Sequence, residues 1–172
     1  MSIDFFISKC QTENVKDKIF GICDDEDLGK KAPAYLDLDN KEKWIAIVEN
    51  QTDIPINFTA IDNCVDIFRA DGTQDCRCDA MLTNVDHIVF IELKDQKRPT
   101  IANKYAEKQL QTTIDHFKLN HDLNKYRFKR AYICNKKRPN FNVGHQSRKN
   151  SFYKKNLILL FIQTQIVFKD SL

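Results

Sequence analysis

HIVFIELK, residues 87–94, is the most strand-like stretch of this 172-residue chain. Four apolar residues in succession, Ile88 to Ile91, require that both faces of the strand be covered. Such a strand belongs in the interior of a sheet that has a further layer on each side. Glu92 and Lys94, near its end, project to the same face, because side chains two apart in a strand do so.

The segments around this strand show both strand and helix patterns. Apolar residues recur at helical spacing from Ala102 to Phe117, which predicts an amphipathic helix. Helical spacing also occurs twice within residues 3–23, and residues 157–168 fit either a strand or a buried helix. Strands are predicted where β-branched and aromatic residues gather between turn signals, at 44–48, 56–61, 64–68, 76–82 and 127–134.

This order of elements predicts the fold class. Helices, several strands, a helix and a further strand are typical of an α/β or α+β protein with a mixed central β-sheet flanked by helices. The length fits one domain, residues 1–172. The apolar fraction of 42% and the charged fraction of 30% are those of a globular chain and exclude wholesale disorder.

Charge is divided unevenly along the chain. Residues 1–66 carry 14 acidic and 7 basic side chains, whereas residues 67–172 carry 10 acidic and 20 basic ones. This asymmetry indicates an anionic partner for the second half, with an unevenly charged solvated surface as the alternative. No membrane partner is expected, because the longest apolar run, 157–162, is far shorter than the about 20 residues of a membrane span.

The six cysteines include no Cys-x-x-Cys pair. Residues 1–10 lack the features of a secretory signal, so a reducing, cytoplasmic location is expected. There the cysteines are free thiols that serve as small apolar residues. A metal site shared by Cys64, Cys76 and Cys78 is the alternative, although no fourth ligand is evident.

Asp79 is a second acidic residue that strand pairing would bring close to Glu92. It precedes a turn at 84–86, so its strand folds back antiparallel onto 87–94. Two adjacent carboxylates repel unless a divalent cation lies between them, and Mg²⁺ accepts such a pair together with water and substrate phosphate. Lys94 would then hold the attacking water and offset developing negative charge. The alternative places Glu92 and Lys94 at a solvated strand end.

Cys78-Asp79-Ala80, followed after a turn by VFIELK at 89–94, resembles the PD-(D/E)XK, or restriction-endonuclease-like, nuclease superfamily. The resemblance covers residues 62–134, with Cys78 where the family often has proline. It implies a restriction-endonuclease-like core in which Asp79 and Glu92 bind Mg²⁺ or Mn²⁺ and Lys94 is catalytic. It also implies hydrolysis of DNA phosphodiester bonds.

Gln109 extends the resemblance, because it lies on the core-facing side of the predicted helix. In the exonuclease and recombination branch of the superfamily, a glutamine at this distance begins a Gln-x-x-x-Tyr motif near the active site. Here Thr113 stands in place of the tyrosine. The resemblance therefore implies a catalytic-site role for Gln109, and a buried glutamine bonded to a backbone group is the alternative.

Many members of the superfamily also use an acidic residue from an earlier element. The sequence does not choose among its candidates, each of which also fits an ordinary structural or surface role. These candidates are Glu13, Glu49, Asp62 and Asp66.

Residues 135–156 are expected to form a basic polar loop without any acidic residue. Its cations are expected to neutralise DNA phosphates, and its aromatic residues to stack on unpaired bases. A solvated mobile loop is the alternative. The predicted nucleic-acid-binding residues are Lys136, Lys137, Arg138, Arg148, Lys149, Lys154 and Lys155.

These features together predict a single-domain, Mg²⁺-dependent deoxyribonuclease. A homodimer is one expected arrangement, since cutting two strands favours a symmetric pair. Two alternatives remain open: a non-catalytic nucleic-acid- or protein-binding domain of the same fold, and an RNA-directed nuclease.

Overall fold

The computed structural model describes residues 2–25, 31–95, 99–137 and 145–170, with only the backbone for 99–103. Its α-helices are α1 (Pro99–Asn120) and α2 (Gln146–Asn156), and short 3-10 helices lie at Ser8–Cys10, Lys41–Lys43 and Leu123–Lys125. The strands are β1 (Gln11–Val15), β2 (Ile19–Cys23), β3 (Tyr35–Asp37), β4 (Ala46–Asn50), β5 (Ile56–Ala60), β6 (Ala80–Thr83), β7 (His87–Lys94), β8 (Phe128–Asn135), β9 (Leu159–Ile162) and β10 (Gln165–Phe168).

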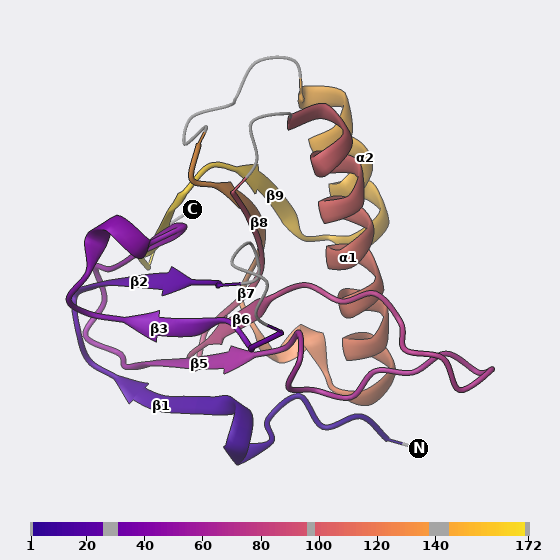
Figure 1. Ribbon diagram of the computed structural model, residues 1–172, viewed down its shortest axis with the longest axis horizontal. Helices are drawn as coiled ribbons and strands as arrows, with labels where there is room; N and C mark the ends of the chain where they lie inside the picture. The colour runs from indigo at the N-terminus through magenta and orange to yellow at the C-terminus, as the bar shows by residue number, and fades with distance from the viewer. Residues whose placement is uncertain (1, 26–30, 96–98, 138–144, 171–172) are drawn as a thin grey trace.

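The described strands form two mixed sheets, one with the order β1-β5-β6-β7-β8-β9 and one with the order β10-β4-β2-β3. The larger sheet is antiparallel from β1 to β7 and parallel from β7 to β9. The two parallel crossovers contain α1 and α2, so both helices pack on the same face of this sheet (Figure 1). The mixed α and β class is thus confirmed, but with a second sheet that the sequence did not predict.

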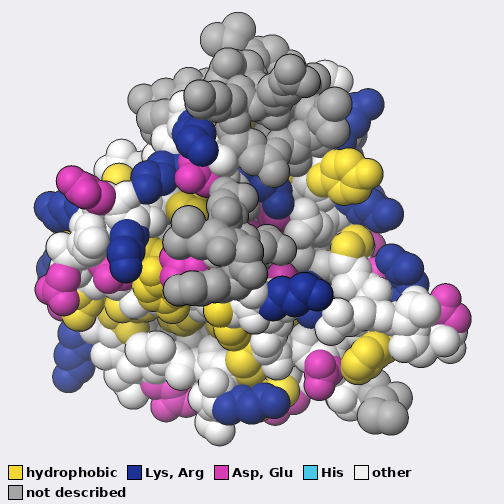
Figure 2. All heavy atoms as spheres, viewed as in Figure 1, with side chains coloured by type: hydrophobic (Ala, Val, Ile, Leu, Met, Phe, Trp, Pro, Cys, Tyr) yellow, Lys and Arg dark blue, Asp and Glu magenta, His cyan; other side chains and the backbone are white. Residues whose placement is uncertain are grey.

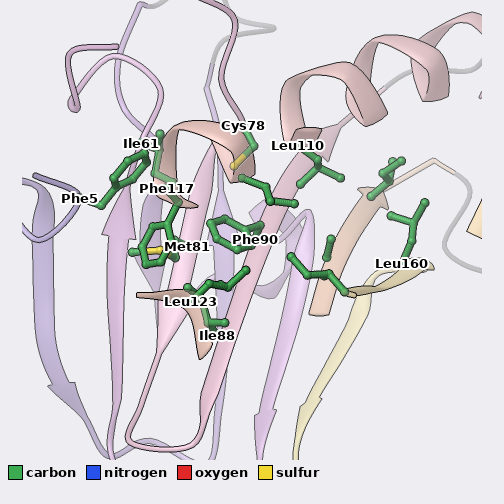
Figure 3. Packing of buried hydrophobic residues seen from close by; sticks show 14 of the residues in the cluster. Phe5, Ile61, Cys78, Met81, Ile88, Phe90, Leu110, Phe117, Leu123 and Leu160 are labelled. Carbon is green, nitrogen blue, oxygen red and sulfur yellow. The ribbon is translucent and has the colours of Figure 1, made fainter. Parts of the chain in front are cut away.

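Two buried clusters make the molecule three-layered. In the first, Leu110 and Phe117 of α1 pack against Met81 and Phe90 of the larger sheet (Figure 3). In the second, the opposite face of the larger sheet packs against the smaller sheet, through residues such as Phe20 and Val48 of the smaller one. The larger sheet is therefore covered on both faces.

The predicted strand at 87–94 is confirmed as β7, an interior strand. Ile88 and Phe90 belong to the cluster beneath the helices, whereas Val89, Ile91 and Leu93 belong to the cluster between the sheets. By the same alternation, the two charged residues at the end of the strand lie on the helix face. The predicted helix and the strand after it are also confirmed, as α1 and β8.

The predicted helices within residues 3–23 are wrong, since the segment forms β1 and β2 and its helical part is only the 3-10 turn at Ser8–Cys10. The run from Phe20 to Cys23 is buried in the smaller sheet between β3 and β4. Within this run, Gly21 leaves room for the Trp44 indole, because a Cβ at this position would come within 2.0 Å of the ring. A short apolar run of this kind fits a buried strand as well as a helix.

Two further strand predictions are wrong or incomplete. Residues 64–68 form no named strand, and only an isolated bridge joins Phe68 to Gln74. The strand predicted at 76–82 begins at Ala80, so Asp79 lies directly before it. The segment 157–168, for which a strand and a buried helix were both open, forms the strands β9 and β10.

The predicted basic loop at 135–156 is wrong in its second half, which forms α2. This helix has only Phe152 and Asn156 buried, so it shows almost no apolar periodicity. Its contacts with α1 stabilise it instead: Asn156 exchanges hydrogen bonds of 2.9 and 2.7 Å with Gln111, and Arg148 pairs with Glu107 at 3.1 Å.

The expectation of six free thiols is also wrong, because Cys10 and Cys64 form a disulfide. Pairing of β1 with β5 places Gln11 opposite Thr59, which brings the residue before β1 close to the turn after β5. This disulfide also removes Cys64 from the suggested three-cysteine metal site. None of the described helices is long and apolar enough to cross a membrane.

Candidate active site

Asp79 lies beside the end of β7. Ala80 pairs with Ile91 in the β6–β7 ladder, so Asp79 falls opposite Glu92. The Asp79 amide donates to the Ile91 carbonyl at 3.1 Å, and the Leu93 amide donates to Asp79 Oδ2 at 2.5 Å. Backbone and side chain together thus fix this carboxylate against β7.

Glu92 is fully buried and forms an ion pair with Lys94, whose side chain is 17% exposed. The other carboxylate oxygen, Oε2, has no hydrogen-bond partner among the described residues. A buried carboxylate oxygen without a partner is costly, so this atom marks a place where a cationic ligand would stabilise the site.

The two carboxylates disfavour each other's charge. Burial raises the pKa of Asp79 to about 7, against the charge of Lys94 and the Leu93 amide, which lower it. Burial and the adjacent Asp79 charge raise the pKa of Glu92 well above its ordinary value, while Lys94 lowers it. Among the main charges from the described residues, Lys94 is the one cation that offsets two close carboxylates, and such a pair holds either a proton or a cation near neutral pH.

Gln109 joins α1 to this cluster. Its Oε1 accepts a hydrogen bond from Lys94 Nζ at 3.3 Å, and its Nε2 donates to the Arg77 carbonyl at 3.1 Å. The glutamine therefore contacts the lysine and also binds a backbone group, so both interpretations of Gln109 describe its geometry. It links Lys94 to the segment that leads into Asp79.

Sequence reasoning missed the role of Thr113. This buried hydroxyl accepts from the Cys78 amide at 2.8 Å and donates to the Gln109 carbonyl at 2.9 Å. Helix α1 thus holds residues 77 and 78 at two points one turn apart, directly before Asp79. The available signal was a second polar residue on the core-facing side of the helix, four residues after Gln109.

Of the upstream acidic candidates, Asp62 lies nearest the cluster. It pairs with Arg77 at 2.8 Å, and its charge adds to burial in raising the pKa of both Asp79 and Glu92. The charge of Asp24, directly after β2, also raises the pKa of Asp79. Asp24 was not among the candidates. An acidic residue that follows a buried apolar strand was the missed signal.

The other three acidic candidates lie elsewhere. Glu13 is exposed on β1, Glu49 contacts Gln165 at the edge between β4 and β10, and Asp66 is exposed after β5. Within the described chain, none of these three is among the main charges that shift the pKa of Asp79 or Glu92.

The predicted DNA-binding residues separate into two groups, with Arg138 outside the described residues. Lys136 contacts the Glu42 carbonyl, and Lys137 pairs with Asp95 at 3.1 Å, both beyond the end of β8. The other four, Arg148, Lys149, Lys154 and Lys155, lie on α2. The cationic surface is therefore carried by a helix and not by a single loop.

Among the described residues, no group of three or more His, Cys, Asp or Glu is arranged to hold a metal ion. Asp79 and Glu92 could supply two carboxylate ligands, and Mg²⁺ is usually bound by one or two. Comparison of the chain with protein-family models, with curated proteins and with solved structures gave no match.

Proposed function

We propose that this protein is a metal-dependent nuclease of the PD-(D/E)XK type that hydrolyses DNA phosphodiester bonds. Its restriction-endonuclease-like core would consist of β6, β7, α1 and β8. One observation carries the proposal: Asp79, Glu92 and Lys94 gather where the start of β6 and the end of β7 meet α1. Phosphodiester hydrolysis uses two acidic ligands and a cation in this way.

The two carboxylates fit Mg²⁺ or Mn²⁺. Glu92 has an oxygen that accepts no hydrogen bond in the described structure, and Asp79 is held in place by the Leu93 amide. A cation bound there would lower the pKa of a coordinated water and neutralise charge on the phosphate. With a cation bound, Asp79 and Glu92 would both be held in their ionised forms, and as its ligands they would fix where the scissile phosphate lies.

Lys94 supplies the remaining positive charge. Its ammonium group would donate a hydrogen bond to the attacking water or to a phosphate oxygen as negative charge develops. Gln109 positions it, because its side chain joins the lysine Nζ to the Arg77 carbonyl. Since both polar atoms of the glutamine amide have partners, the lysine needs little reorganisation during the reaction.

One observation favours the alternative of a non-catalytic binding domain. Glu92 is fully buried and is already paired with Lys94. A nucleic-acid- or protein-binding domain of the same fold would keep this pair as a structural contact. An RNA-directed nuclease would use the same residues as the DNA enzyme, so the substrate must be determined by assay.

A substrate panel tests the proposal. Linear duplex, circular duplex and single-stranded DNA and RNA are incubated with the protein in Mg²⁺, in Mn²⁺ and in EDTA. Cleavage of DNA that requires the metal is expected. Binding without cleavage of any polymer in either metal would favour the non-catalytic domain, and cleavage of RNA alone would favour the RNA-directed enzyme.

A further inference from the structure

Two adjoining hollows lie along the outer side of α1 and α2. One has a volume of about 470 Å³ and lies between the two helices, and the other has a volume of about 400 Å³ and lies near their C-terminal ends. Lys155 lines both hollows, so they adjoin at this residue, and we call the two together the α1–α2 groove. The hydrogen bonds between Gln111 and Asn156 tie the two helices together along it.

This α1–α2 groove is strongly cationic. Only two carboxylates among the described residues line it, Glu107 and Asp122, and Glu107 is already paired with Arg148. Figure 2 shows Lys and Arg side chains recurring at the right of the molecule, where Figure 1 places the two helices. The cations that line the groove are Lys104, Lys108, Lys118, Lys129, Arg148 and Lys155.

The length of the groove favours a polymer over a single phosphate ion. Lys104 and Lys118 both lie on α1, and at 1.5 Å per residue they are about 21 Å apart along its axis. Measured along a duplex axis, this distance contains about six phosphates of each strand, at 3.4 Å of rise per phosphate. The groove therefore fits a run of phosphates.

The lining also favours a duplex over a single strand. Single strands are held largely by stacking of their bases on exposed aromatic rings. Phe152 is the only Phe, Tyr or Trp ring among the described residues that line the two hollows, and it is 3% exposed. Lysines, hydroxyls and amides, which line the groove, are the groups that commonly contact the phosphates and sugars of a duplex.

We propose that the α1–α2 groove binds the phosphate backbone of duplex DNA, as a surface separate from the catalytic cluster. Gln109 contacts Lys94 from one flank of α1, whereas Lys104, Lys108 and Gln111 lie on another, by helical geometry. A helix about 10 Å wide thus stands between the two. The choice of DNA rests on the proposed function, and the groove would hold substrate near the cluster.

Binding measured in EDTA tests this without requiring cleavage. We would record the fluorescence anisotropy of a labelled duplex of about 20 base pairs, which is long enough to span the groove. The measurement is made over a salt series for the parent and for K104Q/K108Q/K155Q. The control K9Q/K16Q/K43Q removes the same charge from exposed lysines far from the helices in sequence. Circular dichroism verifies that both variants fold.

The groove variant is expected to bind about tenfold or more weakly, and its log–log salt slope to be shallower by up to ~2.7, at ~0.9 per lost phosphate contact. The control should match the parent. Equal affinities and slopes for parent and groove variant would overturn the inference, as would tighter parent binding to single-stranded DNA or polyphosphate than to the duplex. If the parent binds duplex through the groove yet never cleaves it, the proposed function fails while the groove stands.

Discussion

Glu92 lies fully buried at the end of β7, with one oxygen that accepts no hydrogen bond from any described residue. A carboxylate in such a place is normally paired on both oxygens or protonated. Asp79 beside it adds a second buried acid, and Lys94 balances only one of the two charges. These three residues account for the proposed chemistry, and each has its own test.

Lys94 is expected to act in the transition state. Removing a group used only there lowers turnover with little change in affinity. Lys94→Ala should bind DNA about as well as the parent and cleave it at least ~100-fold more slowly, the range for one lost electrostatic stabiliser. Single-turnover rates at saturating DNA and anisotropy in EDTA measure the two quantities, and thermal unfolding verifies the fold.

Lys94→Met, which keeps the length of the side chain without its charge, serves as a second variant. Normal cleavage by both variants would show that Lys94 is not catalytic.

Asp79 should make metal-free stability depend on pH. Its folded-state pKa is raised from 3.8 to about 7, mainly by burial, so between these values the folded protein binds more protons than the unfolded chain. The free energy of unfolding should therefore fall as the pH rises from 4 to 7, by up to about 4 kcal/mol at about 1.4 kcal/mol per pKa unit.

Urea unfolding in EDTA at pH 4.5, 6 and 7.5 measures this dependence. Asp79→Asn has no titrating group at this position, so its free energy of unfolding should depend less on pH. The pH dependence that is left should be that due to Glu92. The same pH dependence in the Asp79→Asn variant as in the parent would contradict the assigned pKa.

At the scale of elements, α1 and β7 could be predicted, and β1, β2 and α2 could not. A long, regular apolar pattern identifies α1, and an unbroken apolar run identifies β7. The three wrong predictions share one cause: packing against other elements decided the secondary structure of these segments. Short segments gain their conformation from strand pairing or from polar contacts such as Gln111 with Asn156, and neither leaves a periodic signal.

The same limit applies to the candidate site. Asp79, Glu92 and Lys94 were predicted because strand pairing and alternation fix which residues meet. Thr113 and Asp24 were missed, because their positions depend on how α1 and β2 pack around the β6–β7 ladder.

The contact of α1 with residues 77 and 78 gives a prediction at this scale. Thr113→Val keeps the shape of the side chain and leaves the buried Cys78 amide without its acceptor. We expect a loss of about 1–3 kcal/mol in stability. Turnover should also fall by ~10-fold or more, since Asp79 would be less well positioned.

Thr113→Ser, which retains the hydroxyl, should keep most of the stability and most of the turnover of the parent. If the serine variant is as slow as the valine variant while the stability of both is known from urea unfolding, the hydroxyl does not position the site.

At the scale of the whole molecule, the disulfide ties the first strand of the larger sheet to the turn after β5. Its two cysteines are 54 residues apart, so it closes a long loop in the unfolded chain. The bond does not fit the reducing location expected from residues 1–10, because disulfides persist mainly in oxidising compartments.

The double variant Cys10→Ser/Cys64→Ser should lower the free energy of unfolding by about 4 kcal/mol, from the loop-closure entropy. Guanidinium unfolding with and without dithiothreitol measures this, and the reductant should have no effect on the double variant. Equal stability of the parent in both conditions would contradict a structural role for the bond.

A time course of duplex DNA cleavage in Mg²⁺, with parent and Glu92→Gln side by side, decides whether the buried acids form a catalytic metal site. The amide has the shape of the carboxylate but is a poor ligand for Mg²⁺. We predict metal-dependent cleavage by the parent, none by Glu92→Gln, and equal binding of DNA by both in EDTA. Cleavage by Glu92→Gln at the parent's rate would contradict the proposed nuclease site.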